Sequence, residues 1–439
     1  MAFDRDDAGY ETARRAAVAN ARTPDRHPDR IVLARDADDV SGALSEAAKR
    51  GWQVGVHSGG HSWAASHLRD GGLLLDVSLL RYFEIDAGSR TATAGPGLSG
   101  TLFTEALFEH DLAFPTGHCV NPCLGGFILQ GGFGWNSRAV GPSCMSVEAM
   151  DVVLADGTQT RISETEHPDL FWAARGSGPG FFAVVTRFHL RLHPRPVAQM
   201  SSAILYPPEL IEEVMAWAHA VGPRVPETIE LMVFLRRELM GHPGPGLQVL
   251  APVLADSEEQ AREQMSFLDE APFRHKAIAE DCHVTTDVRE LIQHSADFYP
   301  EGYRYAVDNM WTHASAEELL PGYRKIIETL PDRPSHMMWM NWQPQNGPER
   351  PDMAFSLEDE TYIALYGVWP DATQDGRFND WAETRMRELE QFASGVQLAD
   401  ENLGRRPQPF VSAASLARLD EVRDRYDPER RFHAWMGRP

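Results

Sequence analysis

The chain has 439 residues, of which 43% are hydrophobic and 24% are charged. This composition is typical of a globular protein, and the length is sufficient for two domains. A formal net charge of −23 argues against nucleic acid as a partner, because such a surface repels phosphate backbones. No apolar run reaches the ~20 residues that span a bilayer, and the N-terminal stretch is too polar for a secretory signal. We therefore expect a cytoplasmic protein, without a membrane partner, that is a monomer or a homodimer.

The first half of the chain alternates between helix and strand signals. Residues 36–51 predict a helix that begins at an aspartate and stops at a glycine, and 52–56 predict a buried strand. Further strands are predicted at 73–80, 90–95 and 150–162, the last of which contains a D-G turn, and a long alternating strand at 179–194. Two prolines at 194 and 196 place a domain boundary near residue 195.

The second half again alternates strands and helices, which indicates a second layered unit. Amphipathic helices are predicted at 257–272 and 315–331, and strands rich in aromatic residues at 337–345 and 360–369. The tail from residue 412 onward predicts a helix followed by a coil that carries aromatic side chains.

Two glycine-rich segments carry the chemical signal. The first, V-H-S-G-G-H-S-W at 56–63, directly follows a predicted strand. The second, G-H-C-V-N-P-C-L-G-G-F-I-L-Q-G-G-F-G-W at 117–135, contains six glycines, so we predict a loop there. Glycine lets the backbone approach a ligand closely, and successive N–H groups can cradle a phosphate. Both segments therefore predict contact with something flat or anionic.

These segments resemble motifs of the berberine bridge enzyme branch of the vanillyl-alcohol oxidase superfamily, which has a PCMH-type FAD-binding fold. In that superfamily the last residue of an S-G-G-H motif, here His61, bonds covalently to the flavin. In the berberine bridge enzyme branch a cysteine at the offset of Cys119 forms a second flavin bond. Segments 169–188 and 425–432 are similar to two further motifs of the branch, in the same order along the chain.

The resemblance implies a two-domain α+β protein that holds FAD covalently. Residues 1–195 would form the FAD-binding domain, 196–419 an antiparallel-sheet substrate domain covered by helices, and 420–439 a segment that returns to the FAD domain. FAD would be bonded to His61 and Cys119. The remaining cofactor-binding residues would be Val56, His57, Ser58, Gly59, Gly60, Ser62, Gly117, His118, Gly125, Gly126, Gly131, Gly134, Trp135 and Val184.

Other interpretations of these residues exist. His57 and His61 have the spacing of a helical zinc pair, but the two glycines between them disfavour a helix, so we predict no metal site. Cys119 could instead be a buried free thiol, or form a metal or disulfide pair with Cys123; we interpret Cys123 as a packing residue. The G-P-G-L-S-G turn at 95–100 matches a dinucleotide motif but lacks the acidic residue ~20 positions on, so NAD is not expected.

The chain departs from the branch where substrate and oxygen would react. Pro122 stands where oxidases of the branch often carry valine, and Phe127 where a histidine often supports the flavin. Gln397, Ala399 and Phe410 align with the tyrosine, asparagine and second tyrosine of many relatives. The usual general base of the branch is therefore missing from its place.

Replacement bases must reach the substrate by a hydrogen bond and have a suitable pKa. The candidates are Tyr305, Asp308 and Asp400, with His313 and His433 also considered.

The predicted strand 336–343 resembles the sheet that covers the flavin in relatives. Its alternation places Trp339 and Asn341 on one face and Met338, Met340 and Trp342 on the other. We predict a substrate pocket lined by Trp339, Asn341, Gln397 and Phe410.

The resemblance implies an FAD-dependent oxidase. It would take a hydride from an alcohol, an amine or an activated C–H of a small to medium, apolar or aromatic, natural-product-like substrate. Molecular oxygen would be the second partner and would be reduced to hydrogen peroxide. A dehydrogenase of the same fold with another electron acceptor remains an alternative, as does a flavin-holding cyclase or binding protein without redox turnover.

Overall fold

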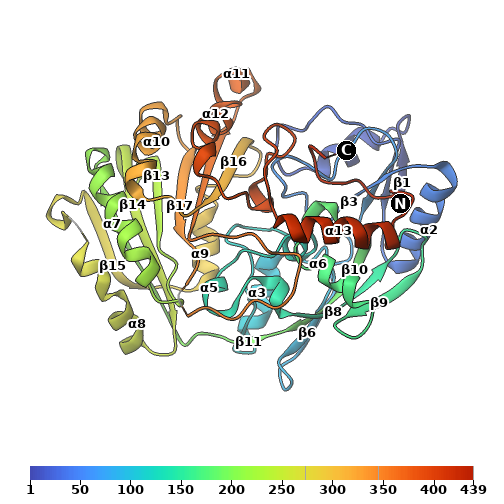
Figure 1. The fold of residues 1–439 in the computed structure, drawn as a ribbon, viewed down its shortest axis with the longest axis horizontal. Helices are drawn as coiled ribbons and strands as arrows, with labels where there is room; N and C mark the ends of the chain where they lie inside the picture. Colours follow the sequence, from blue (N-terminus) through green and yellow to red (C-terminus); the bar gives the residue numbers. More distant parts are fainter. Residues whose placement is uncertain (272, 345, 439) are drawn as a thin grey trace.

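The computed structural model describes residues 1–271, 273–344 and 346–438 and shows two halves side by side (Figure 1). The last positions of the predicted helix 257–272 and the predicted strand 337–345, and residue 439, lie outside the described residues. Among the described residues, the first half carries two larger sheets and a two-stranded sheet of β7 (Leu112–Ala113) and β11 (His193–Pro194), and the second half carries one large sheet.

The first sheet combines a parallel core with one antiparallel edge strand. Its order is β1 (Ala2–Asp4), β2 (Arg30–Leu33), β4 (Leu73–Asp76) and β3 (Val54–His57). Helix α2 (Ala37–Arg50) connects β2 to β3, as predicted. The Asp36 side chain accepts a hydrogen bond from the Asp39 N–H at the start of α2, and Gly51 ends the helix with φ +66°. Helix α1 (Tyr10–Ala16) lies between β1 and β2 in the chain.

The second sheet is antiparallel. Its order is β5 (Phe83–Asp86), β6 (Thr91–Ala94), β10 (Val184–Arg191), β8 (Val147–Val153) and β9 (Gln159–Ser163), with the predicted D-G turn between β8 and β9. The remaining elements of this half are α3 (Gly100–Phe108), β7 (Leu112–Ala113), α4 (Leu124–Leu129), α5 (Ser137–Val140), α6 (Pro168–Ala174) and β11 (His193–Pro194).

Two local predictions for the first half were wrong. The strand predicted from residue 179 begins only at Val184, because Gly178–Gly180 form a 3-10 turn and Gly180 packs on the Trp435 ring. A Cβ at Gly180 would lie 2.3 Å from that ring. The segment 117–135 is not all loop, because Leu124–Leu129 form a helical turn despite Gly125 and Gly126.

The second half is built on a seven-stranded antiparallel sheet. The strand order is β15 (Ala279–Thr285), β12 (Ala198–Tyr206), β14 (His242–Ala255), β13 (Met232–Leu239), β17 (His336–Asn341), β18 (Thr361–Trp369) and β16 (Arg304–Thr312). Its helices are α7 (Ile211–Val221), α8 (Glu258–Gln264), α9 (Val288–Ser295), α10 (Ala316–Thr329), α11 (Asp375–Phe378) and α12 (Trp381–Glu388). The predicted antiparallel sheet covered by helices is confirmed.

The two faces of this sheet have different partners because side chains alternate along each strand. One face, with Trp339 and Leu365, packs under α7, α10 and α12. The other face, with Met338 and Tyr366, packs with Trp63 of the first half. The sheet therefore presents the Met338 face to the first half.

The C-terminal segment returns to the first half. Helix α13 (Ala413–Tyr426) contacts α6 in the right-hand half of the molecule (Figure 1). Phe432 pairs with Val54 of β3, and the Arg431 guanidinium donates to the Ala47 carbonyl at 3.2 Å. Among the described residues, no helix has the length and apolar character of a membrane span.

Candidate active site

A cavity of about 230 Å³ lies where the glycine-rich segments of the first half meet the second-half sheet. Two smaller cavities measure about 20 Å³ each. The first half contributes both glycine-rich segments to the lining, and the other side is formed by Tyr299, Met338, Tyr366, Leu398, Ala399 and Asp400. The cavity is therefore the place where the two predicted functional segments come together.

The two glycine-rich segments pack against each other without room for side chains. A Cβ at Gly59 would lie 2.7 Å from the Cys123 sulfur, and a Cβ at Gly125 would lie 2.8 Å from the Ser58 hydroxyl. Gly60 has φ +67°, a conformation that other residues rarely adopt. These contacts explain why glycine occupies these positions.

His61 and Cys119 both line the cavity, as do Val56, His57, Ser58, Gly59, Gly60, Ser62, Gly117, His118, Gly125 and Gly126. Burial lowers the pKa of His61, so its imidazole is neutral at neutral pH and has a free lone pair. Burial, and next the nearby Asp400 carboxylate, raise the pKa of the Cys119 thiol. Both side chains belong to one site although 57 residues separate them in the sequence.

The four remaining predicted cofactor residues do not line the cavity. Gly131 packs against the Phe355 ring, and Gly134 against the Thr116 carbonyl. The Trp135 ring lies 4.4 Å from the His118 ring, and Val184 is fully buried in the core. These residues lie behind the cavity wall. At the start of β10 the wall is formed by Ala183 and Val185 instead.

His57 contacts the Asp76 carboxyl group under the first segment. Its Nδ1 lies 2.9 Å from Asp76 Oδ1, and only 5% of the His57 side chain is exposed.

No group of three or more histidine, cysteine, aspartate or glutamate side chains that could hold a metal occurs within residues 1–271, 273–344 and 346–438. The four cysteines are free.

Asp400 reaches the cavity from the loop before α13. Its Oδ1 accepts a hydrogen bond from Trp63 Nε1 at 2.8 Å. Its Oδ2 accepts from the Tyr362 hydroxyl at 2.6 Å and from the Tyr366 hydroxyl at 2.8 Å. Burial raises the pKa of both tyrosines well above the usual value, so they remain protonated donors. One acceptor position of the carboxylate is left for a ligand, because a carboxylate has about four.

The other candidate bases lie elsewhere. Tyr305 stacks on Trp63 and donates to the Pro300 carbonyl at 2.6 Å, outside the cavity lining. Asp308 lies on the face of β16 that is turned away from the cavity, where it forms a buried ion pair with Arg406. His313 is an exposed partner of Asp359.

His433 does line the cavity, beside β3. Burial lowers its pKa to about 4, so it is neutral at neutral pH.

The prediction for the substrate pocket was wrong, because none of its four residues lines the cavity. Trp339 and Asn341 lie on the helix-covered face, where Trp339 Nε1 donates to His219 and Asn341 Nδ2 to the Gly222 carbonyl. Gln397 turns back and accepts from the Ala399 N–H. Phe410 packs on the Trp435 ring at 4.8 Å. The alternation along 337–341 was predicted correctly, but the opposite face meets the first half.

Sequence reasoning missed the aromatic side chains that surround Asp400: Trp63, Tyr299, Tyr362 and Tyr366. A signal was present for two of them. Tyr362 and Tyr366 are four residues apart on the predicted strand 360–369, so they share a face. The sequence does not show which face of the sheet this is, because that depends on how the whole sheet packs.

The lining fits a dinucleotide cofactor. Asp400 is the one carboxylate among the described lining residues. The glycine segments supply backbone N–H groups that suit phosphates. Gly126 has no atom within 4 Å of a Cβ position, so this part of the wall is open to the cavity.

The chain is similar in sequence to known FAD-binding proteins. Residues 28–163 match the family model for an FAD binding domain. The chain is 31% identical over 434 residues to the FAD-linked oxidoreductase ptmO of Penicillium ochrochloron, covering 98% of this chain and 94% of that protein.

Solved structures share the fold. 6-Hydroxy-D-nicotine oxidase of Arthrobacter nicotinovorans superposes with a TM-score of 0.85 at 20% identity, covering 99% of this chain and 96% of that one. BBE-like 1 of Physcomitrella patens superposes with a TM-score of 0.83 at 17% identity, with the same coverage. The chain belongs to the FAD-linked oxidoreductases. Its fold is the PCMH-type, berberine bridge enzyme-like fold of the vanillyl-alcohol oxidase superfamily.

The protein is thus an FAD-dependent enzyme that acts on a small-molecule substrate. The backbone of 58–60 and 117–126 would hold the cofactor, with His61 and Cys119 on the same wall. Bound FAD supplies the acceptor for two electrons taken from a substrate C–H bond.

We expect Gly126→Leu to reduce FAD binding. The new side chain meets no protein atom at its Cβ, so it enters the cavity while the fold is retained. FAD content per mole of purified protein, with circular dichroism as the measure of folding, checks this. The control is Gly42→Leu, which is exposed on α2 and equally open. Full FAD content in the Gly126 variant would contradict this location of the cofactor.

Proposed function

We propose that this FAD-linked oxidoreductase is an oxidase. It takes a hydride from a C–H beside an alcohol or amine, or from an activated ring position, and oxygen is reduced to hydrogen peroxide. The observation that carries the proposal is the Asp400 carboxylate, which lies in the same cavity as His61 and Cys119 and keeps one acceptor position free.

Asp400 serves as the acceptor for the proton that leaves the substrate O–H or N–H as the hydride leaves carbon. The free position on Oδ1 suits direct contact, because Oδ2 already accepts from both tyrosines. The hydroxyl of Tyr366, which lines the cavity, offers a second contact to the substrate. In this arrangement Asp400 takes the role of the tyrosine that is missing from its usual place.

The lining supports a small to medium, apolar or aromatic, natural-product-like substrate. Tyr299, Tyr366, Phe133 and Met338 supply aromatic and apolar surface. No lysine or arginine occurs among the lining residues that the structure describes, and one carboxylate does. A neutral substrate or a protonated amine therefore fits this charge, whereas an acidic substrate would be repelled.

Covalent attachment of FAD to His61 and Cys119 forms part of the proposal. Both side chains line the cavity, and the imidazole is in the neutral form that a nucleophile requires. A covalent bond would keep the cofactor from dissociating during turnover.

We expect acid-precipitated protein to give a yellow pellet. Mass spectrometry of its peptides should find the FAD mass on both the His61 and the Cys119 peptide. His61→Ala and Cys119→Ala should each retain one bond, and the double variant should give a colourless pellet. FAD on the His61 peptide alone would show that Cys119 is a packing thiol, and a colourless wild-type pellet would disprove covalent attachment.

We expect Asp400→Asn to slow flavin reduction by about 10²- to 10⁴-fold, the usual contribution of a general base. The amide keeps the shape of the side chain but cannot take the proton. Anaerobic stopped-flow with a panel of benzylic alcohols and N-alkylbenzylamines measures the bleaching of the flavin. The exposed Asp256→Asn is the matched control and should reduce at the wild-type rate. An equally fast Asp400 variant would rule out this role.

We expect photoreduced protein to return to its oxidised spectrum when oxygen is admitted, with one hydrogen peroxide formed per flavin.

The rival function is a dehydrogenase, which is favoured by one observation: Pro122 lines the cavity where oxidases of the branch often carry valine. Flavin that stays reduced in air and is reoxidised only by ferricyanide would establish the dehydrogenase. Pro122→Val should then restore reoxidation by oxygen.

A further inference from the structure

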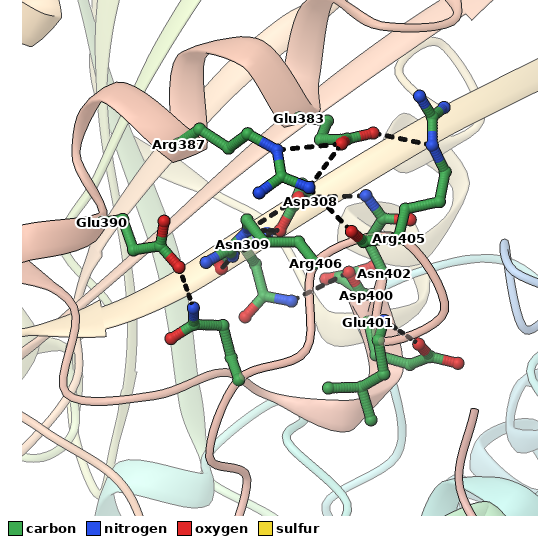
Figure 2. A network of polar contacts seen from close by, with 12 residues as sticks. Asp308, Asn309, Glu383, Arg387, Glu390, Asp400, Glu401, Asn402, Arg405 and Arg406 are labelled. Atoms are coloured by element: carbon green, nitrogen blue, oxygen red, sulfur yellow. Dashed lines mark hydrogen bonds and ion pairs between the residues drawn. The ribbon is translucent and has the colours of Figure 1, made fainter. Parts of the chain in front are cut away.

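The loop that carries Asp400 is attached to strand β16 by the side chain of Asn309 (Figure 2). Asn309 Nδ2 donates to the Gln397 carbonyl at 3.0 Å and to the Asp400 carbonyl at 2.8 Å. Asn309 Oδ1 accepts from the Gln397 N–H at 2.8 Å. Asn309 is fully buried, so all three bonds are protected from water.

A buried ion pair secures the same loop from the other side of the strand. The Asp308 and Arg406 side chains are each 1% exposed. Arg406 Nε donates to Asp308 Oδ2 at 2.9 Å, and Arg406 Nη2 donates to the Asn309 carbonyl at 2.6 Å. Asn402 Nδ2 also donates to Asp308, at 3.1 Å. Residues 397–406 are therefore bound to two consecutive residues of β16 (Figure 2).

The carboxylate of Asp400 meets donors from two other parts of the chain. Trp63 belongs to the first glycine-rich segment, whereas Tyr362 and Tyr366 belong to β18. Three bonds from separate elements can form together only if the Asp400 backbone is held in one place. Strands β16 and β18 are joined by their own backbone hydrogen bonds, so the pairing of the strands does not require the Asn309 side chain.

We propose that Asn309, supported by the Asp308–Arg406 ion pair, is a positioning residue that places the Asp400 carboxylate at the reacting atoms. The inference rests on the proposed role of Asp400 as proton acceptor. Asn309 does not line the cavity and so acts through Asp400. A displacement of about 1 Å at a catalytic group can reduce the rate by ~10²-fold.

Asn309→Leu is the principal variant, because leucine has a similar size and forms none of the three bonds. Asn309→Asp is the second variant; it retains the acceptor for the Gln397 N–H and loses the donor to the Asp400 carbonyl. Thr312→Val is the matched control on the same strand. The Thr312 hydroxyl donates to the Phe392 carbonyl at 2.7 Å and accepts from the Ala314 N–H, so it also attaches a loop to β16.

The readout that needs no substrate is the indole N–H of Trp63, which donates to Asp400. It is observed by nitrogen-15 NMR of the flavin-loaded full chain and assigned with Trp63→Phe. We expect both Asn309 variants to shift this resonance toward its position in Asp400→Asn and to speed its hydrogen exchange by about tenfold, as for the loss of one hydrogen bond. Thr312→Val should leave it unchanged. An unmoved Trp63 resonance in both Asn309 variants would overturn the proposal.

Flavin reduction by the fastest member of the benzylic panel tests the functional consequence. We expect Asn309→Leu to be about 10- to 100-fold slower than wild type and to add no further loss when combined with Asp400→Asn. Multiplied losses in the double variant would overturn action through Asp400. If Asp400→Asn alone reduces at the wild-type rate while the Trp63 resonance responds as expected, the proposed role of Asp400 fails and the positioning by Asn309 stands.

Discussion

The two glycine-rich segments pack closely enough to form one wall of the cavity, and the site is built on this contact. Gly59 lies against Cys123, and Gly125 lies against Ser58, at separations that leave no space for a Cβ. These contacts join residues 64 and 67 positions apart and form one continuous wall. His61 and Cys119 lie on that wall because each belongs to one of the two segments.

The opposite wall depends on which face of the seven-stranded sheet is left uncovered. Helices α7, α10 and α12 bury one face with apolar side chains. The face with Met338, Tyr362 and Tyr366 then has to pack against the first half, since an uncovered aromatic surface of that size would be unfavourable in water. The same packing that completes the core brings Tyr366 to the cavity and both tyrosine hydroxyls to Asp400.

Asp400 shows how packing and chemistry are combined at this site. Its backbone is held by a buried amide on β16, and its carboxylate by an indole and two phenols from other elements. The two aspartates considered as bases have opposite environments. Asp308 faces a guanidinium and is neutralised by it, whereas Asp400 faces neutral donors and stays available as an acceptor. The proposed reaction therefore depends on a loop whose position is set by contacts from both halves of the molecule.

Features that depend on neighbouring residues could be predicted from the sequence. The α2 boundaries follow from Asp36 and Gly51, because helix caps are local constraints. The two glycine-rich segments around His61 and Cys119 can also be recognised from the sequence. The face of the strand that meets the cavity follows only from the packing of the whole chain. Trp339 was therefore assigned to the wrong face, although the predicted alternation of side chains was correct. Tertiary structure also separated Asp400 from Asp308, because their partners come from distant strands and loops. Periodicity defines two faces, and only the packing of remote segments determines which of them becomes the active site.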